Sequence, residues 1–195
     1  MTTSRRSSDD GHILISGTGR AGTTLLVKYF TALGFDTGFS TEQANRIVDP
    51  SINAGLEHVS ETEPLPYVIK SPHYADLLGR CLDLGTLQIQ CCIVPVRRLF
   101  DAAESRRQVG LLWLVKDPQD QEHVLAVQLH KLLEALVRHN VTTHFLYFPT
   151  FAESAESLYS GLKPLLDKHG VSRGESDAAH LEVVDRQLIH RFSDP

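Results

Sequence analysis

A glycine-rich stretch near the start of the chain has the composition of a phosphate-binding turn. Gly17, Gly19 and Gly22 follow the apolar run 13–15, and the residues after Gly22 continue as the apolar face of a helix. Such a turn leaves several backbone N–H groups at a helix N-terminus pointing toward one spot, where the helix dipole favours an anion. The stretch 12–26 therefore predicts a strand, a phosphate-binding loop and a helix.

The dinucleotide-binding fingerprint matches this stretch only in part. The glycine spacing is correct, and Asp36 lies near the place of the acid that binds a ribose hydroxyl in that motif. That acid should end a second apolar strand, but residues 34–38 contain too few apolar side chains and too many glycines to form one. The pattern therefore disfavours a dinucleotide.

The nucleoside-triphosphate loop is the second partial match. Residues 17–24 fit it except that Thr23 replaces the lysine that neutralises the β- and γ-phosphates. The cation is instead Arg20, inside the turn. This difference argues against ordinary hydrolysis of ATP or GTP.

A second potential phosphate contact follows a later apolar strand. Arg97 closes the run 87–96, and Ser105 follows eight residues later with Asp101 between them. Arginine offers a forked pair of N–H donors to a phosphate, and serine adds a hydroxyl. Because such residues gather at the carboxyl ends of parallel strands, we expect Arg97 and Ser105 to lie near the glycine-rich loop. Arg98 is expected to point to the opposite face.

The short apolar run 66–69 ends in a third polar segment, Lys70-Ser71-Pro72-His73-Tyr74. Lys70 would bring a further cation to the same edge of the sheet. His73 could accept a proton near neutral pH, because an imidazole needs little adjustment of its pKa for this role.

Together these segments resemble the sulfotransferases that use 3′-phosphoadenosine 5′-phosphosulfate, in particular the glycan, tyrosine-type and bacterial branches. Residues 19–24 resemble the family's 5′-phosphosulfate loop, where Lys or Arg precedes a small residue and Gly-Thr-Thr. Arg97 with Ser105 resembles the pair that recognises the donor's 3′-phosphate, and Lys70 begins a segment similar to the Lys-Ser/Thr-x-x-Tyr of glycan sulfotransferases. The resemblance covers most of the range 12–148.

The resemblance implies that 3′-phosphoadenosine 5′-phosphosulfate is the donor and that no metal is needed. The implied donor-binding residues are Gly19, Arg20, Ala21, Gly22, Thr23 and Thr24 for the 5′-phosphosulfate, with Arg97 and Ser105 for the 3′-phosphate. The ten histidines are dispersed, and the sequence shows no cluster at metal-ligand spacing.

The implied reaction moves a sulfuryl group to a hydroxyl or amine of a small-molecule or saccharide acceptor. By analogy with phosphoryl transfer, catalysis would come mostly from alignment and charge stabilisation, with Arg20 and Lys70 as the cations. Glu42, which lies 22 residues after Arg20, matches a glutamate at about this distance in the glycan and tyrosine branches and is a candidate base. Glu57 and His73 are alternatives.

Two other functions stay open at this stage. A nucleotide kinase with an altered loop would bind ATP together with magnesium. A binding module would keep the nucleotide pocket but would have no competent base.

The predicted elements alternate between strands and helices, which indicates an α/β fold: a three-layer sandwich with a central parallel sheet and a P-loop-like strand–loop–helix. The segment 37–63 is expected to be irregular with short helical pieces, and the tail to carry little beyond a short helix near 182–190. Strands are predicted over 13–15, 66–69, 87–96 and 143–148, and helices over 23–33, 74–84, 122–139 and 154–169.

Length and composition suit one cytoplasmic domain. The chain has 195 residues, and we expect a disordered N-terminal arm over 1–11 and a single domain over 12–195. The net charge of −5 does not suggest a nucleic-acid surface, and no run approaches transmembrane length. Three cysteines are too few for a secreted disulfide framework. Trp113 is expected to pack in the core, with a substrate-facing lid as the alternative.

Overall fold

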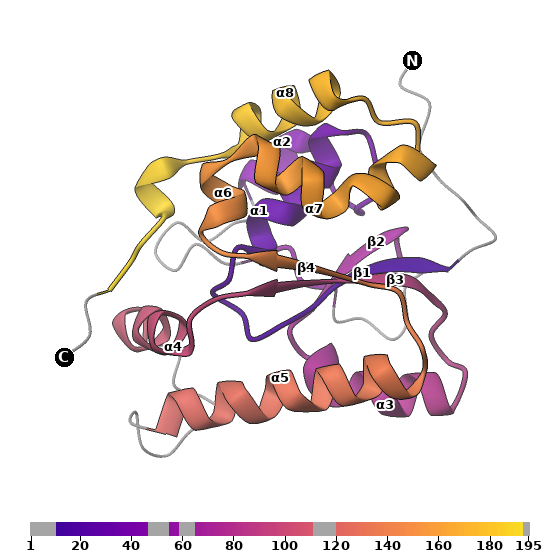
Figure 1. Cartoon of the computed structure of the whole chain (residues 1–195), viewed down its shortest axis with the longest axis vertical. Coiled ribbons are helices and arrows are strands. Elements are labelled where there is room, and N and C mark those ends of the chain that lie inside the picture. Colours follow the sequence, from indigo (N-terminus) through magenta and orange to yellow (C-terminus); the bar gives the residue numbers. More distant parts are fainter. Residues whose placement is uncertain (1–10, 47–54, 59–64, 111–119, 193–195) are drawn as a thin grey trace.

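The central sheet places four strand ends at one edge of the molecule (Figure 1). The computed structural model describes residues 11–46, 55–58, 65–110 and 120–192. Within these residues the sheet is entirely parallel and its strand order is β2-β1-β3-β4. The strands are β1 (His12–Ile15), β2 (Val68–Lys70), β3 (Ile89–Val96) and β4 (Thr143–Tyr147).

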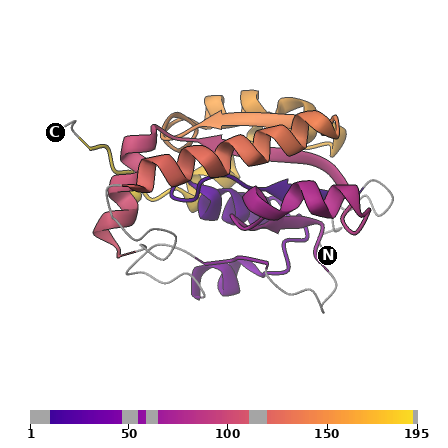
Figure 2. The same cartoon turned by 90° about the horizontal axis from the view of Figure 1, so that it is seen from below.

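Helices cover both faces of this sheet, so the predicted three-layer α/β class is confirmed. In Figure 1, α1, α6, α7 and α8 lie above the sheet and α3 and α5 lie below it. Figure 2 shows α3 and α5 side by side on the lower face. The helices are α1 (Thr23–Ala32), α2 (Thr41–Arg46), α3 (Tyr74–Asp83), α4 (Leu99–Gln108), α5 (Gln121–Arg138), α6 (Thr150–Glu153), α7 (Ala155–Lys168) and α8 (Arg173–Val183), followed by the 3-10 turn η2 (Arg186–Leu188).

Alternating side chains of the strands supply two separate apolar layers. Ile13 and Ile93 pack in the cluster that contains residues of α1 and α7, whereas Leu14 and Cys92 pack in the cluster that contains residues of α3 and α5. Successive side chains of a strand point to opposite faces, so a strand covered on both faces is apolar throughout. This explains the short continuous apolar runs in the sequence.

The C-terminal region differs from the sequence-based expectation. Instead of a short helix near 182–190, the structure has the longer helix α8, of which only the last two residues fall in that range, followed by the single turn η2. The Ser172 side chain accepts a hydrogen bond from the Glu175 N–H, and the Glu175 side chain accepts one from the Ser172 N–H. This Ser-x-x-Glu capping box is a sequence signal for a helix start that our prediction missed.

Some expectations concern residues outside the described ranges. The N-terminal arm falls there except for Gly11, and so does the segment around Trp113. In the part of the chain that the structure describes, no helix has both the length and the apolar composition needed to cross a membrane.

Candidate functional site

A cavity of about 510 Å³ lies where the four strands end. Its lining includes Thr18 after β1, Lys70 at the end of β2, Arg97 after β3 and Phe148 after β4. The carboxyl edge of a parallel sheet is where ligands commonly bind in open α/β folds. The three polar segments singled out in the sequence therefore meet in one place.

The glycine-rich loop between β1 and α1 has the backbone shape of an anion-binding turn. Gly19, Arg20 and Gly22 have φ angles of 70°, 55° and 84°. This left-handed region is uncommon for a residue with a side chain, so Arg20 is held in a strained conformation of the kind that clusters at functional sites. Gly22 precedes α1 without a side-chain cap, so the first N–H groups of the helix are available to an anion.

Gly22 also lies where no side chain fits. A Cβ atom there would lie 2.8 Å from Phe151 Cζ and 2.9 Å from Phe148 Cδ2. We expect Gly22→Ala to lower the free energy of unfolding by about 2–4 kcal/mol, because overpacking adds to the cost of a positive φ. Urea unfolding measures this loss.

Gly19→Ala is the matched control for that measurement. Gly19 also has a positive φ, but a Cβ atom on it would meet no atom within 4 Å among the described residues. Its loss should therefore be limited to the conformational cost, about 1–2 kcal/mol. Equal losses for the two variants would contradict a packing role for Gly22.

The loop and the end of β3 are joined by arginine contacts. Arg20 Nε donates a hydrogen bond to Ser105 Oγ at 3.0 Å, and an Arg97 terminal nitrogen donates one to the Arg20 carbonyl at 2.8 Å. Arg97 is 6% exposed, and its buried Nε has no hydrogen-bond acceptor among the described residues. Arg97 and Ser105 therefore lie beside the loop, as the sequence predicted.

Arg106 adds a third guanidinium that the sequence analysis did not assign to the site. It is buried, lines the cavity and donates a hydrogen bond to the Thr18 carbonyl at 3.5 Å. Burial lowers the pKa of Arg20, Arg97 and Arg106, and the charge of Arg20 lowers the pKa of the other two further. Like charges held this close in a buried site favour an anionic ligand.

Lys70 connects the end of β2 to the same loop. Its side chain is 2% exposed, and Nζ lies 2.5 Å from Glu57 Oε1, 2.6 Å from the Gly55 carbonyl oxygen and 3.4 Å from Thr24 Oγ1. Burial lowers the pKa of Lys70, whereas the adjacent Glu57 raises it. The lysine is thus a buried cation with three oxygen acceptors beside the loop.

The three candidate bases occupy different places. Glu57 lines the cavity, with a side chain that is 30% exposed, and His73 lines it at the start of α3. Glu42 lies on α2, has a side chain that is 83% exposed, and its Oε1 is 3.9 Å from Arg46. Because Glu42 does not line the cavity, the structure does not bring it together with the other predicted residues.

The C-terminal segment supplies a part of the cavity that the sequence did not indicate. The His190 carbonyl accepts a hydrogen bond from Arg97, and this end of the lining is largely apolar. Further lining residues at this end are Leu25, Lys28, Val183, Val184, Asp185, Leu188 and Ile189. The polar tail has no residue pattern that would have predicted this position.

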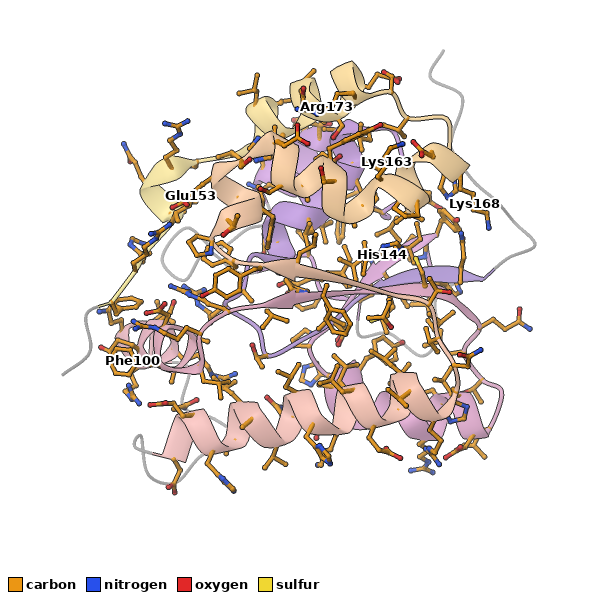
Figure 3. The ribbon with its side chains drawn as sticks, in the orientation of Figure 1. Phe100, His144, Glu153, Lys163, Lys168 and Arg173 are labelled. Carbon is orange, nitrogen blue, oxygen red and sulfur yellow. The ribbon has the colours of Figure 1, made fainter. Side chains whose placement is uncertain are left out.

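Arg98, the residue that precedes α4, does not line the cavity. It pairs with Asp101 at 2.7 Å and donates a hydrogen bond to the Phe192 carbonyl. Nearby, Arg191 pairs with Glu153 at 2.6 Å, which holds the tail against α6; Figure 3 labels Glu153 there. These contacts fix the C-terminal segment beside Arg97.

The fold and this site define the chain as an α/β protein with a cation-rich cavity at the carboxyl edge of a parallel sheet. In the ranges that the structure describes, no group of three or more His, Cys, Asp or Glu side chains is arranged to hold a metal ion. No protein-family model, curated protein or solved structure matches the chain.

Proposed function

We propose that this protein is a sulfotransferase that uses 3′-phosphoadenosine 5′-phosphosulfate. The observation that carries the proposal is the contact between the two halves of the expected donor site. Arg20 of the glycine-rich loop and Ser105 of α4 lie within hydrogen-bond distance, 85 positions apart in sequence, and Arg97 contacts the same loop. This arrangement supports a ligand with two separate anionic groups.

The cavity fits such a nucleotide in size and in chemical character. Its volume of about 510 Å³ lies within the range of about 300–1,000 Å³ that is typical of small-molecule sites. Arg20 and the N–H groups at the start of α1 would hold the 5′ end, and Arg97 with Ser105 the 3′-phosphate. The apolar end near Leu25 and Ile189 would receive the adenine.

The bound donor would supply a sulfuryl group joined through oxygen to a phosphate. Lys70 would stabilise the negative charge that develops as this sulfur–oxygen bond breaks and a new bond forms from sulfur to the acceptor oxygen or nitrogen. Glu57 would accept the proton that the acceptor loses. We assign the base to Glu57, because its carboxylate lies in the cavity 2.5 Å from Lys70 Nζ, whereas Glu42 does not line the cavity; His73, which also lines it, is the second candidate.

The acceptor in this proposal is a small molecule or a saccharide that presents a hydroxyl or an amine. The chemistry needs no metal, because Arg20, Arg97, Arg106 and Lys70 already bring positive charge to the cavity.

A cytoplasmic location belongs to the same proposal. Burial raises the pKa of the Cys91 thiol to about 12, consistent with a packing role rather than a reactive one.

Binding of adenosine 3′,5′-bisphosphate tests the proposal. At a concentration of about 100 times Kd it should stabilise the protein by about 2.7 kcal/mol, or about 5–10 °C in Tm for a chain of this size. Adenosine 5′-monophosphate, which lacks the 3′-phosphate, should stabilise it less. Differential scanning fluorimetry measures both shifts.

Each alternative predicts a different combination of ligand stabilisation and sulfuryl transfer. Stabilisation by ATP with magnesium but not by the bisphosphate would support an altered nucleotide kinase and contradict our proposal. Stabilisation by the bisphosphate, without sulfuryl transfer to any acceptor or to water, would support a binding module.

A further inference from the structure

His58 forms hydrogen bonds with both backbone polar groups of Lys70, the C=O and the N–H. The His58 N–H donates to the Lys70 carbonyl at 2.8 Å, and the Lys70 N–H donates to His58 Nδ1 at 2.9 Å. The other ring nitrogen, Nε2, lies 3.0 Å from the Thr37 carbonyl. Nδ1 must therefore lack a proton and Nε2 must carry one, so the bonded imidazole is neutral.

These contacts are made on the outer side of an edge strand. Within the described sheet, β2 pairs only with β1, and the Ser71 N–H on the next residue donates to the Ile15 carbonyl. The N–H and C=O of Lys70 therefore point away from β1. A strand edge leaves such groups without partners unless another segment covers it, and here His58 does so.

The same segment carries the proposed base. Glu57 immediately precedes His58, and its carboxylate lies 2.5 Å from Lys70 Nζ. Residues 55–58 belong to no helix or strand, so regular secondary structure does not fix their position. The hydrogen bonds of His58 hold Glu57 opposite Lys70, together with the burial of Leu56 in the core and the contact of the Gly55 carbonyl with Lys70 Nζ.

We propose that neutral His58 is a positioning residue that aligns Glu57 with Lys70, and that protonation of its Nδ1 releases this alignment. The proposal rests on the function assigned above to Lys70 and Glu57. A protonated Nδ1 would carry a hydrogen atom that faces the Lys70 N–H. It could no longer accept the hydrogen bond from Lys70, so one of the two hydrogen bonds between His58 and the Lys70 backbone would be lost.

The surroundings of the ring favour its neutral form. Burial lowers the pKa of His58 and is the largest effect. The hydrogen bond with the Thr37 carbonyl and the charge of Glu57 raise this pKa, and the charge of Lys70 lowers it. These are the ionisable groups that act on the ring among the described residues; the Phe39 ring packs at 5.3 Å. Because the folded-state pKa is lowered, the stabilisation is complete above the ordinary value of about 6.5 and is lost as the pH falls through the folded-state value.

Two substitutions separate the role of Nδ1 as a hydrogen-bond acceptor from the effect of its protonation. His58→Asn places an amide oxygen where Nδ1 accepts and does not titrate, whereas His58→Ala removes the acceptor. His144→Asn is the matched control, because burial also lowers the pKa of His144, which lies on β4 outside the cavity (Figure 3). Transfer of the sulfuryl group to water, followed as sulfate release from the donor, provides a rate without a known acceptor.

We expect His58→Ala to lower this rate at least about tenfold and to leave Kd for adenosine 3′,5′-bisphosphate within about threefold. His58→Asn should keep most of the rate at pH 7 and should lose less of it than the native protein as the pH falls below about 6.5. His144→Asn should follow the native profile. Equal loss in His58→Asn and His58→Ala, or unchanged rates in both, would overturn the proposal.

A nucleotide-free measurement distinguishes failure of this inference from failure of the proposed function. Nitrogen NMR of the histidine ring should show Nδ1 without a proton and Nε2 with one, and amide hydrogen exchange at Lys70 should be faster in His58→Ala than in His58→Asn. A protonated Nδ1 at pH 7 would overturn the role of His58 whether or not the protein binds the bisphosphate. Absence of bisphosphate binding with this NMR signature present would instead overturn the sulfotransferase proposal.

Discussion

Replacing Arg97 by alanine is expected to weaken binding of adenosine 3′,5′-bisphosphate at least about 100-fold. Each hydrogen bond to a charged group contributes about 1.5–3 kcal/mol, and a forked contact with the 3′-phosphate would supply two. The loss of about 3–6 kcal/mol then corresponds to at least two powers of ten in Kd. Isothermal titration calorimetry measures the change directly.

Two further variants show whether the effect comes from the fork or from charge alone. Arg97→Lys keeps the charge but not the planar pair of donors, so we expect an intermediate loss of about tenfold. Arg138→Ala removes an arginine from α5 that is 47% exposed and does not line the cavity, and it should leave Kd unchanged. If Arg97→Ala binds as tightly as the native protein, the 3′-phosphate site is not at Arg97.

Thermal unfolding without ligand is a necessary companion measurement. Arg97 also donates hydrogen bonds to the carbonyls of Arg20 and His190, so its loss disturbs the loop and the C-terminal segment as well. Adenosine 5′-monophosphate separates the two effects. Its binding should fall less than that of the bisphosphate if the 3′-phosphate is the group that Arg97 contacts.

The sequence could predict that the residues at strand ends lie together. The carboxyl ends of parallel strands lie at the same edge of the sheet in any strand order. Lys70 and Arg97 each follow a short apolar run, and the carboxyl ends of parallel strands meet whichever strands are neighbours. The fold class followed from the alternation of predicted strands and helices.

Residues in irregular segments could not be predicted, because tertiary contacts set their paths. The resemblance to sulfotransferases favoured Glu42 as a candidate base, but Glu42 lies exposed on α2. Glu57 lies at the cavity, where the contacts of His58 with Lys70 and the burial of Leu56 hold its segment. Those contacts join positions 12 residues apart and have no sequence pattern. The C-terminal residues that line the cavity, such as Ile189, are equally without a local signal.

Lys70→Met is expected to change activity and stability in opposite directions. Loss of a group that stabilises charge in the transition state costs about 100- to 1,000-fold in rate, measured as sulfate release from the donor. Burial lowers the pKa of Lys70, so the folded protein disfavours its charged form. We therefore expect the methionine variant without ligand to be more stable at pH 7, because the Glu57 carboxylate left without its partner is 30% exposed and can be solvated by water.

The sign of this stability difference can be followed with pH. The folded-state pKa of Lys70 is lowered from 10.5. The native protein should therefore gain stability as the pH rises from this lowered pKa toward 10.5, and Lys70→Met should lack this gain. Urea unfolding of both proteins between about pH 7 and pH 10 measures it. A methionine variant that is less stable at pH 7 would show that the contacts of the amine outweigh its burial.

Glu57→Gln tests whether the Glu57 carboxylate offsets the free-energy cost of burying the charged Lys70 side chain. The carboxylate is the only acidic partner of Lys70 among the described residues, so its removal should destabilise the protein, by about 1–2 kcal/mol because the carboxylate is 30% exposed. In the double variant Lys70→Met/Glu57→Gln most of that loss should disappear, since no buried charge is left. Under the proposed function, binding of the anionic donor beside Lys70, Arg20, Arg97 and Arg106 should stabilise the protein and offset part of the free energy lost by burying these cations.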